Sequence, residues 1–252
     1  MHDSVSILWP ALLAGILVLA SHVPLGTQVL QRGIIFIDLA VAQAAATGAL
    51  LANFLLDHPQ GWQTEIAAGA AALAMALALH QMERWLPEIQ EAVIGGSFVM
   101  LACVAILATS HDSHGAEHIG NLLAGQILWV DTTMLIGLAV ASALALLAMA
   151  LFRHPLARFY LPFALAITAA VQAVGVYLVF ASLIFPALAT LHLQGRRALA
   201  LALVTGVSGY AVGLAASLWL DLPSGPAVVV ALGLLTLAGI SHRLWAGQAG
   251  NP

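Results

Sequence analysis

Hydrophobic residues occupy most of the chain in long runs that are separated by short polar or charged breaks. A membrane-spanning helix needs about 20 mostly apolar residues to cross roughly 30 Å of hydrocarbon. The runs that we predict to be full-length spans are Ile7–Leu30, Ile34–Leu56, Ile66–His80, Ala92–Ser110, Thr132–Phe152, Ala198–Leu220 and Ala227–Leu244. The pattern therefore predicts an all-α protein, a polytopic transmembrane helical bundle.

One further apolar tract, Leu161–Leu193, is too long for one span and short for two. It contains Gly175 and Pro186, residues that interrupt helices. We expect a span that ends near Phe180, followed by a shorter, proline-containing return helix around Ile184–Leu193. An irregular turn at that depth is tolerated only where protein or a water-filled cavity covers it. The prediction is about eight full spans plus a short return helix.

The arginines indicate which side of the membrane each loop faces, because basic loops are retained in the cytoplasm. With the N-terminus outside, the return helix makes the C-terminus cytoplasmic and places every basic residue inside: Arg32, Arg84, Arg153, Arg158, Arg196, Arg197 and Arg243. The outer side then collects Asp3, Asp57, Glu65, Asp112, Glu117, Asp131 and Asp221. An acidic surface without basic residues attracts cations.

The amino-acid composition narrows the class of protein further. Hydrophobic residues make up 62% of the 252 residues and charged residues only 7%, whereas a soluble domain carries about a quarter charged residues. We therefore expect residues 1–252 to form a single transmembrane domain solvated by the lipid bilayer, which excludes soluble, disordered and nucleic-acid-binding proteins. The seven basic residues are all Arg, so a Walker A lysine is absent and any ATP hydrolysis must come from a partner.

The predicted loop before Thr132 is dense in potential metal ligands: His111, Asp112, His114, Glu117 and His118. If the segment is helical, its three imidazoles share one face, which suits a borderline-soft ion such as zinc. The alternative is a polar outer loop in which the histidines are incidental. We expect this loop to gather ions near an entrance rather than to be the transport site.

A few polar residues fall inside the predicted spans, where an ionisable side chain is a functional hypothesis by default. His22 lies late in the first span, where Pro24 weakens the helix, and Asp38 and Gln43 lie in the cytoplasmic half of the second. Gln172 precedes the glycine of the long tract. Together these side chains could line a polar pathway; each could instead make a helix-packing hydrogen bond.

The run that precedes Asp221 carries two further patterns. Gly209, Gly213 and Ser217 form a small-xxx-small stripe, which we expect to serve close helix packing. Ser208 lies in a Gly-x-Ser-Gly sequence of the form seen around the serine of intramembrane rhomboid proteases. The only later histidine, His242, lies about 10 Å away along the helix axis at about 1.5 Å rise per residue, so we reject the dyad and expect no enzyme activity in this chain.

The order of four segments points to a family. These are Gln31–Gly48, Asn121–Val130, Val174–Ala189, with its Val-Gly-x-x-Leu-Val run ending in Ile-x-Pro-Ala, and Asp221–Gly225. In this order and spacing they resemble the ABC-3 family, the integral-membrane permease subunits of zinc and manganese ABC importers. The resemblance covers the chain from about Arg32 to Gly239.

The resemblance implies a type II ABC importer-like permease in the plasma (inner) membrane. It implies a homodimer around a central pathway, two cytoplasmic ABC ATPase subunits and an extracytoplasmic metal-binding protein that delivers the ion. The transported ion would be Zn²⁺ first and Mn²⁺ second, with no permanently bound cofactor. The alternative is a secondary metal-ion transporter or channel that is not coupled to an ATPase.

The sequence departs from the family at two places. The second helix of the family usually carries an Asp-x-x-x-His pair thought to touch the ion; here Gln43 takes the His position and Leu39 the Asp position, with Asp38 one residue earlier. The loop that normally couples to the ATPase, Phe152–Tyr160, is shorter than the family pattern. We expect coupling through the cytoplasmic basic residues Arg153, Arg158, Arg196 and Arg197.

Overall fold

The computed structural model describes residues 2–56, 60–85, 87, 90–109 and 127–249. Its helices are α1 (His2–Arg32), α2 (Ile37–Leu55), α3 (Gly61–Trp85), α4 (Gln90–Thr109), α6 (Thr132–Leu151), α7 (Leu161–Val174), α8 (Val176–Ala189), α9 (Gly195–Leu220) and α10 (Ser224–Ala249). Two short elements join them, the 3-10 turn η2 (Ile127–Trp129) and the π-helical turn η3 (Leu156–Tyr160). No strand occurs in the described part of the chain, so the all-α prediction is confirmed.

Apolar helices of two lengths build the bundle. The 6 that are long and apolar enough to cross a membrane are Leu8–Arg32, Gly61–Trp85, Thr132–Leu151, Leu156–Val174, Gly195–Leu220 and Ser224–Ser241. Shorter apolar helices cover Ile37–Asn53, Val93–Ala105 and Val176–Ala189. The predicted polytopic bundle is therefore confirmed, and the count of eight full spans is approximate.

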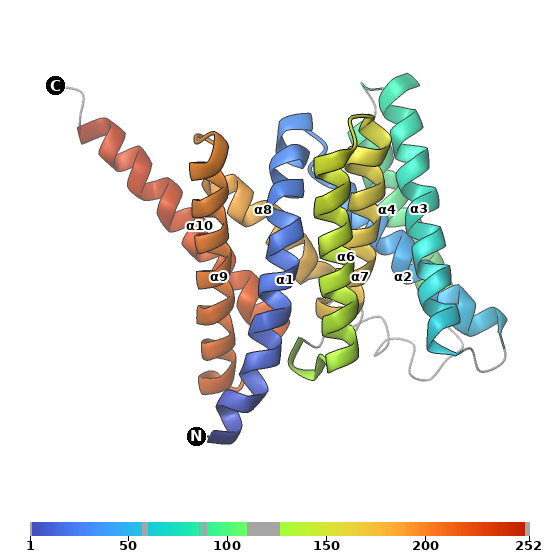
Figure 1. Ribbon diagram of the computed structural model, residues 1–252, viewed down its shortest axis with the longest axis horizontal. Helices are drawn as coiled ribbons and strands as arrows, with labels where there is room; N and C mark the ends of the chain where they lie inside the picture. The colour runs from blue at the N-terminus through green and yellow to red at the C-terminus, as the bar shows by residue number, and fades with distance from the viewer. Residues whose placement is uncertain (1, 57–59, 86, 88–89, 110–126, 250–252) are drawn as a thin grey trace.

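The helices stand side by side, with α1 and α8 in the middle of the bundle (Figure 1). On one side α1 contacts α9, and α8 contacts α9 and α10. On the other side α6 packs between α1 and α7, and α7 contacts α2 and α3, which pack with α4. The side chains of α7 and α8 are mostly buried. The core of the protein is therefore formed around the two helices of the long tract.

A backbone break at Gly175 divides this tract. Gly175 has φ 82° and ψ 162°, a region that is essentially restricted to glycine. The chain therefore leaves α7 and restarts at once as the short helix α8. The short return helix was predicted, but its predicted position, after a span ending near Phe180, is wrong. The torsion of Gly175 sets the break, whereas Pro186 is accommodated inside α8.

Glycines allow two close helix contacts. A Cβ atom at Gly26 would collide with the backbone carbonyl of Leu183, so α1 and α8 touch backbone to backbone. A Cβ atom at Gly213 would collide with the backbone of Val228, which brings α9 against α10. The second contact confirms that the predicted stripe of small residues serves packing.

The Gly175 break yields a stability prediction. Replacing Gly175 by Ala forces a side chain into a glycine-only region and should cost about 1–3 kcal/mol of folding free energy. The unfolding midpoint of the purified protein in detergent should fall. Gly239→Ala is the matched control, because a Cβ atom there meets nothing within 4 Å and α10 is helical at that position. Equal midpoints for the two variants would contradict the assigned role of Gly175.

Candidate metal pathway

His22 is the buried imidazole of α1, with 0% exposure. Its Nδ1 lies 2.9 Å from the carbonyl oxygen of Val18 and 3.1 Å from the hydroxyl of Ser21. A proton on Nδ1, donated to that carbonyl, leaves the lone pair on Nε2. Nε2 is buried and has no hydrogen-bond partner among the described residues. The local structure thus presents a neutral nitrogen of the kind that binds a transition metal.

Two serines hold α6 against the turn of α1 that carries His22. The hydroxyls of Ser21 and Ser142 lie 3.2 Å apart, and Ser142 also donates to the carbonyl of Leu17 at 3.0 Å. These bonds satisfy the hydroxyls locally, so His22, Ser21 and Ser142 form a small polar group inside an apolar core. The imidazole is therefore held by two contacts within α1, and one of them, Ser21, is itself bonded to α6.

Asp38 lies in the first turn of α2 and is 1% exposed. Neither carboxylate oxygen has a hydrogen-bond partner of good geometry in the described structure. The N-terminus of a helix favours a negative charge through its free N–H groups, which offsets part of the cost of burying this carboxylate. Gln43 follows on the same helix and is also buried, at 6% exposure.

These predicted pathway residues lie at different depths. His22 precedes the end of α1 by about 15 Å at about 1.5 Å per residue, whereas Asp38 follows that end directly, in the first turn of α2. Within the described ranges, no three His, Cys, Asp or Glu side chains come close enough to hold a metal ion. The arrangement therefore resembles successive points along a route, at His22, Asp38 and Gln43, rather than a single coordination shell. Contact of these residues with the ion stays a prediction.

The predicted outer-loop ligands cannot be placed. His111, Asp112, His114, Glu117 and His118 lie outside the described residues. Their role as an ion-gathering loop stays a prediction.

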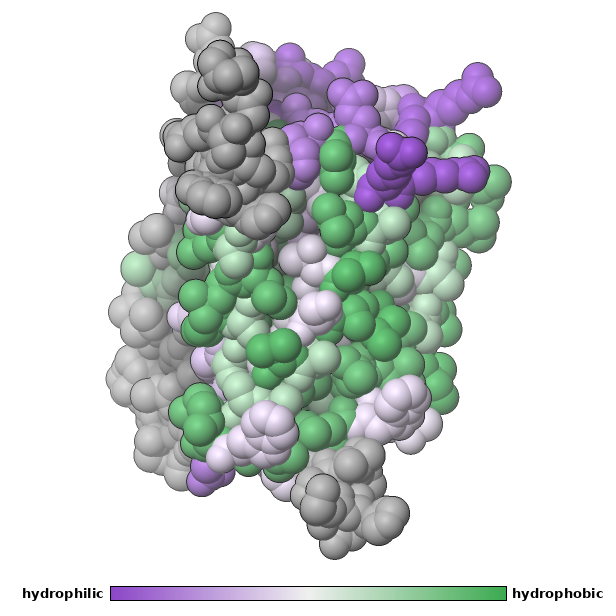
Figure 2. Space-filling model, turned by 90° about the vertical axis from the view of Figure 1, so that its left-hand side faces the viewer, coloured by the Kyte–Doolittle hydropathy of each residue, from purple (hydrophilic) through white to green (hydrophobic). Residues whose placement is uncertain are grey.

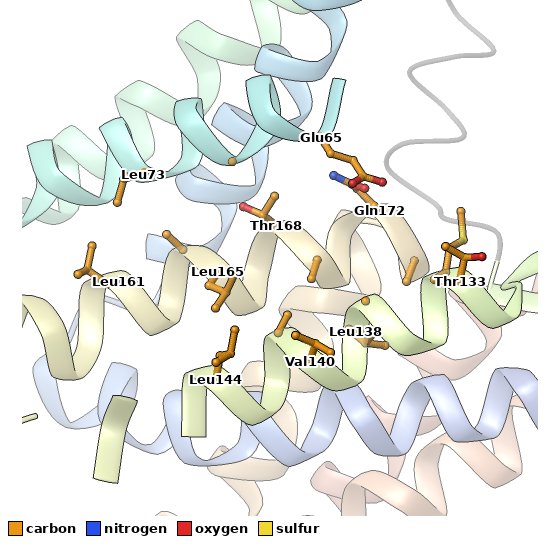
Figure 3. A pocket seen from close by; sticks show the side chains of 17 residues that line it. Glu65, Leu73, Thr133, Leu138, Val140, Leu144, Leu161, Leu165, Thr168 and Gln172 are labelled. Atoms are coloured by element: carbon orange, nitrogen blue, oxygen red, sulfur yellow. The ribbon is translucent and has the colours of Figure 1, made fainter. Parts of the chain in front are cut away.

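Gln172, the fourth predicted polar residue, is exposed rather than buried. It lines an open groove of about 720 Å³ between α3, α6 and α7. Figure 3 shows Gln172 close to Glu65 at one end of this groove, while leucines such as Leu161 and Leu165 line the other end. This mainly apolar groove is lined by Gln172 but not by His22 or Asp38.

The basic residues in the described part of the chain gather at one end of the bundle. Helices α1, α3 and α6 finish at one end, where α7 and α9 begin (Figure 1). We call it the arginine end, after Arg32, Arg84, Arg153, Arg158, Arg196 and Arg197. Hydrophilic side chains gather there above a hydrophobic band (Figure 2). The acids Glu65, Asp131 and Asp221 lie at the opposite ends of α3, α6 and α9.

The four arginines predicted to contact an ATPase, Arg153, Arg158, Arg196 and Arg197, are all exposed. Between α6 and η3 the chain has only residues 152–155 outside a helix. The short loop expected from the sequence is therefore present.

An ionic contact at the arginine end was not among the sequence predictions. Arg32 Nη1 donates to Glu83 Oε1 at 2.7 Å, and the Tyr160 hydroxyl donates to Glu83 Oε2 at 2.8 Å. The sequence signal for this contact was Glu83 itself, an acidic residue next to Arg84 in a predicted cytoplasmic segment. Its partners could not be inferred, because they lie 51 and 77 residues away along the chain.

Solved structures with a similar fold include the following two. The structure described as PsaBC from Streptococcus pneumoniae in complex with Fab matches with a TM-score of 0.70 and 21% identity, over 92% of this chain and 90% of that one. An inward-facing conformation of an ABC transporter assigned to the metal-chelate type matches with a TM-score of 0.69 and 14% identity, over 92% and 85%. At these identities the likeness shows a shared fold. No curated protein matches the chain.

The sequence profile described as the ABC 3 transport family matches residues 4–163 and 157–243, most of the chain. The resemblance inferred from the four sequence segments is thereby confirmed. Proteins of this family are membrane permease subunits of ABC transporters and are not themselves the ATPase. The chain belongs to the ABC 3 transport family.

Proposed function

We propose that this permease imports divalent metal ions, zinc first and manganese second, driven by ATP hydrolysis in a partner. The observation that carries the proposal is the buried Nε2 atom of His22, which is held ready as a ligand by the Nδ1 contact to Val18. An imidazole nitrogen suits zinc, and the carboxylate of Asp38 suits either zinc or manganese. Because zinc or manganese is the transported substrate, its contacts with the protein need only be transient.

The proposed complex contains a second copy of the chain, a cytoplasmic ABC ATPase and an extracytoplasmic metal-binding protein. The homodimer and the two protein partners follow from the family resemblance. The exposed side chains of Arg153, Arg158, Arg196 and Arg197 support ATPase docking, since they can bind an acidic surface.

The arginine end is proposed to face the cytoplasm, because basic residues are retained on that side. The N-terminus then lies outside and the C-terminus inside the plasma (inner) membrane. Ions would enter from the end that carries Glu65, Asp131 and Asp221, where negative charge raises the local cation concentration.

One observation favours a second candidate function, a metal transporter or channel without an ATPase. The connection between α6 and η3 is short, and it lies where the family couples to its motor. Radiolabelled zinc uptake into proteoliposomes separates the candidates. The importer requires the cognate ATPase and ATP, whereas uptake at the same rate without them would contradict it.

The pathway residues can be tested by single substitutions. His22→Ala and Asp38→Asn should each lower zinc uptake at limiting zinc about tenfold or more, because each removes a ligand atom from the route. Membrane abundance should not change. Gln81→Ala is the control, since the Gln81 side chain is exposed on α3 and lies outside both the proposed route and the short loop. Uptake that stays normal in both pathway variants would refute the assignment.

The outer loop generates a separate prediction. Replacing His111, His114 and His118 together by Ala should raise the zinc concentration required for half-maximal uptake and leave the maximal rate unchanged. The physical reason is that the loop concentrates ions at the entrance and takes no part in the crossing itself. An unchanged half-maximal concentration would mean that the histidines are incidental.

A further inference from the structure

We infer that Glu83 is a positioning residue that fastens the π-helical turn η3 to the ends of α1 and α3, so that these elements move together during transport. The inference rests on the proposed function. It concerns the Glu83 cluster, which consists of Arg32, Glu83, Gln90, Phe159 and Tyr160.

Both oxygens of the Glu83 carboxylate are engaged by different elements. Oε1 accepts from Arg32 at the end of α1, and Oε2 accepts from Tyr160 in η3. The side chains of Arg32 and Glu83 are only 27% and 30% exposed, so water screens this pair less than a fully exposed one. Short charge-assisted bonds of this kind are stronger than neutral ones. One carboxylate therefore links three elements.

Arg32 is held from a second direction. Its guanidinium carbon lies 4.3 Å from the ring centroid of Phe159, a cation–π distance. Phe159 and Tyr160 are both 0% exposed. The two residues at the end of η3 thus contact the arginine and the carboxylate of the same ion pair, one through its ring face and the other through its hydroxyl.

Helix α4 joins the cluster through Gln90, which is 5% exposed. Its Nε2 donates to the carbonyl of Leu79 at 3.3 Å and to the Tyr160 hydroxyl at 3.4 Å. The His80 ring packs against Tyr160, with the centroids 4.9 Å apart. The ends of α1 and α3 and the start of α4 therefore surround one turn.

The position of η3 in the chain explains how the Glu83 cluster could transmit movement. Residues 152–155, with exposed Arg153, lead directly into η3, and η3 continues into α7 without interruption. Through Arg32 the same turn is connected to α1, the helix that carries His22. A π-helical turn is rare, often occurs at functional sites, and here is fixed by contacts from outside. A displacement of the short loop would therefore reach both α7 and α1.

The test compares zinc imported per ATP hydrolysed by the reconstituted permease–ATPase complex. Glu83→Gln removes the charge but keeps an acceptor oxygen, and Tyr160→Phe removes only a hydroxyl while the buried ring remains. Each should lower the zinc-to-ATP ratio by about tenfold, the equivalent of one charge-assisted hydrogen bond, with ATP hydrolysis and abundance unchanged. Arg84→Gln, one residue along and exposed, is the matched control and should leave the ratio unchanged.

A purely stabilising role of Glu83 would not change the zinc-to-ATP ratio. A second measurement tests whether Glu83 holds the turn η3. Amide hydrogen exchange over residues 152–160 should be faster in Glu83→Gln than in Arg84→Gln. The double variant Glu83→Gln/Tyr160→Phe should be no worse than the poorer single variant, because both substitutions act on the same link between Glu83 and Tyr160.

The outcomes separate the two claims. Wild-type uptake together with an unchanged ratio in Glu83→Gln and Tyr160→Phe would overturn the coupling role of Glu83 and leave the proposed function intact. Equal exchange rates would overturn the fastening of the turn. No zinc uptake by the wild-type complex would overturn the proposed function, and the coupling role with it.

Discussion

A lipid bilayer offers a protein neither hydrogen-bond partners nor counter-charges, and this constraint explains most of the structure. Backbone groups in the apolar tracts are satisfied within helices. Some buried hydroxyls find partners nearby: Ser182 donates to the Leu178 carbonyl at 2.6 Å and pairs with Tyr210 at 2.8 Å. The buried His22 Nε2 and the Asp38 carboxylate are among the buried polar atoms that have no such partners in the described residues. Burying these polar groups without partners costs folding free energy, as expected for groups that serve to move an ion.

Helix α1 connects the proposed metal route to the arginine end. Helix α1 carries the buried imidazole of His22 in its interior and Arg32 in its last turn. It crosses α8 at Gly26 with no space for a side chain, so it cannot shift without moving its neighbours. The Glu83 cluster holds the C-terminal end of the same helix. In the proposed importer, ATP-driven movement at the cytoplasmic surface and ion passage near His22 are thus linked by one helix.

The sequence predicted those features that depend on run length and residue type. Long apolar runs located the helices, and the arginine pattern required a short return helix in the tract that contains Gly175. Length alone could not locate the break, which depends on a backbone torsion at Gly175 rather than on Pro186. Residue type also made His22 and Asp38 candidates for the pathway, but it could not show that some of their polar atoms lack partners. The contact of Glu83 with Arg32 and Tyr160 is created by tertiary packing and has no local sequence signal.

The central claim is that the arginine end faces the cytoplasm, and cysteine accessibility tests it most directly. Single cysteines are introduced as Arg153→Cys, Arg197→Cys and Asp221→Cys after the native, exposed Cys103 is replaced by Ser. A membrane-impermeant maleimide should label positions 153 and 197 only in inside-out vesicles and position 221 only in right-side-out vesicles. Labelling of positions 153 and 197 from different sides would contradict the account.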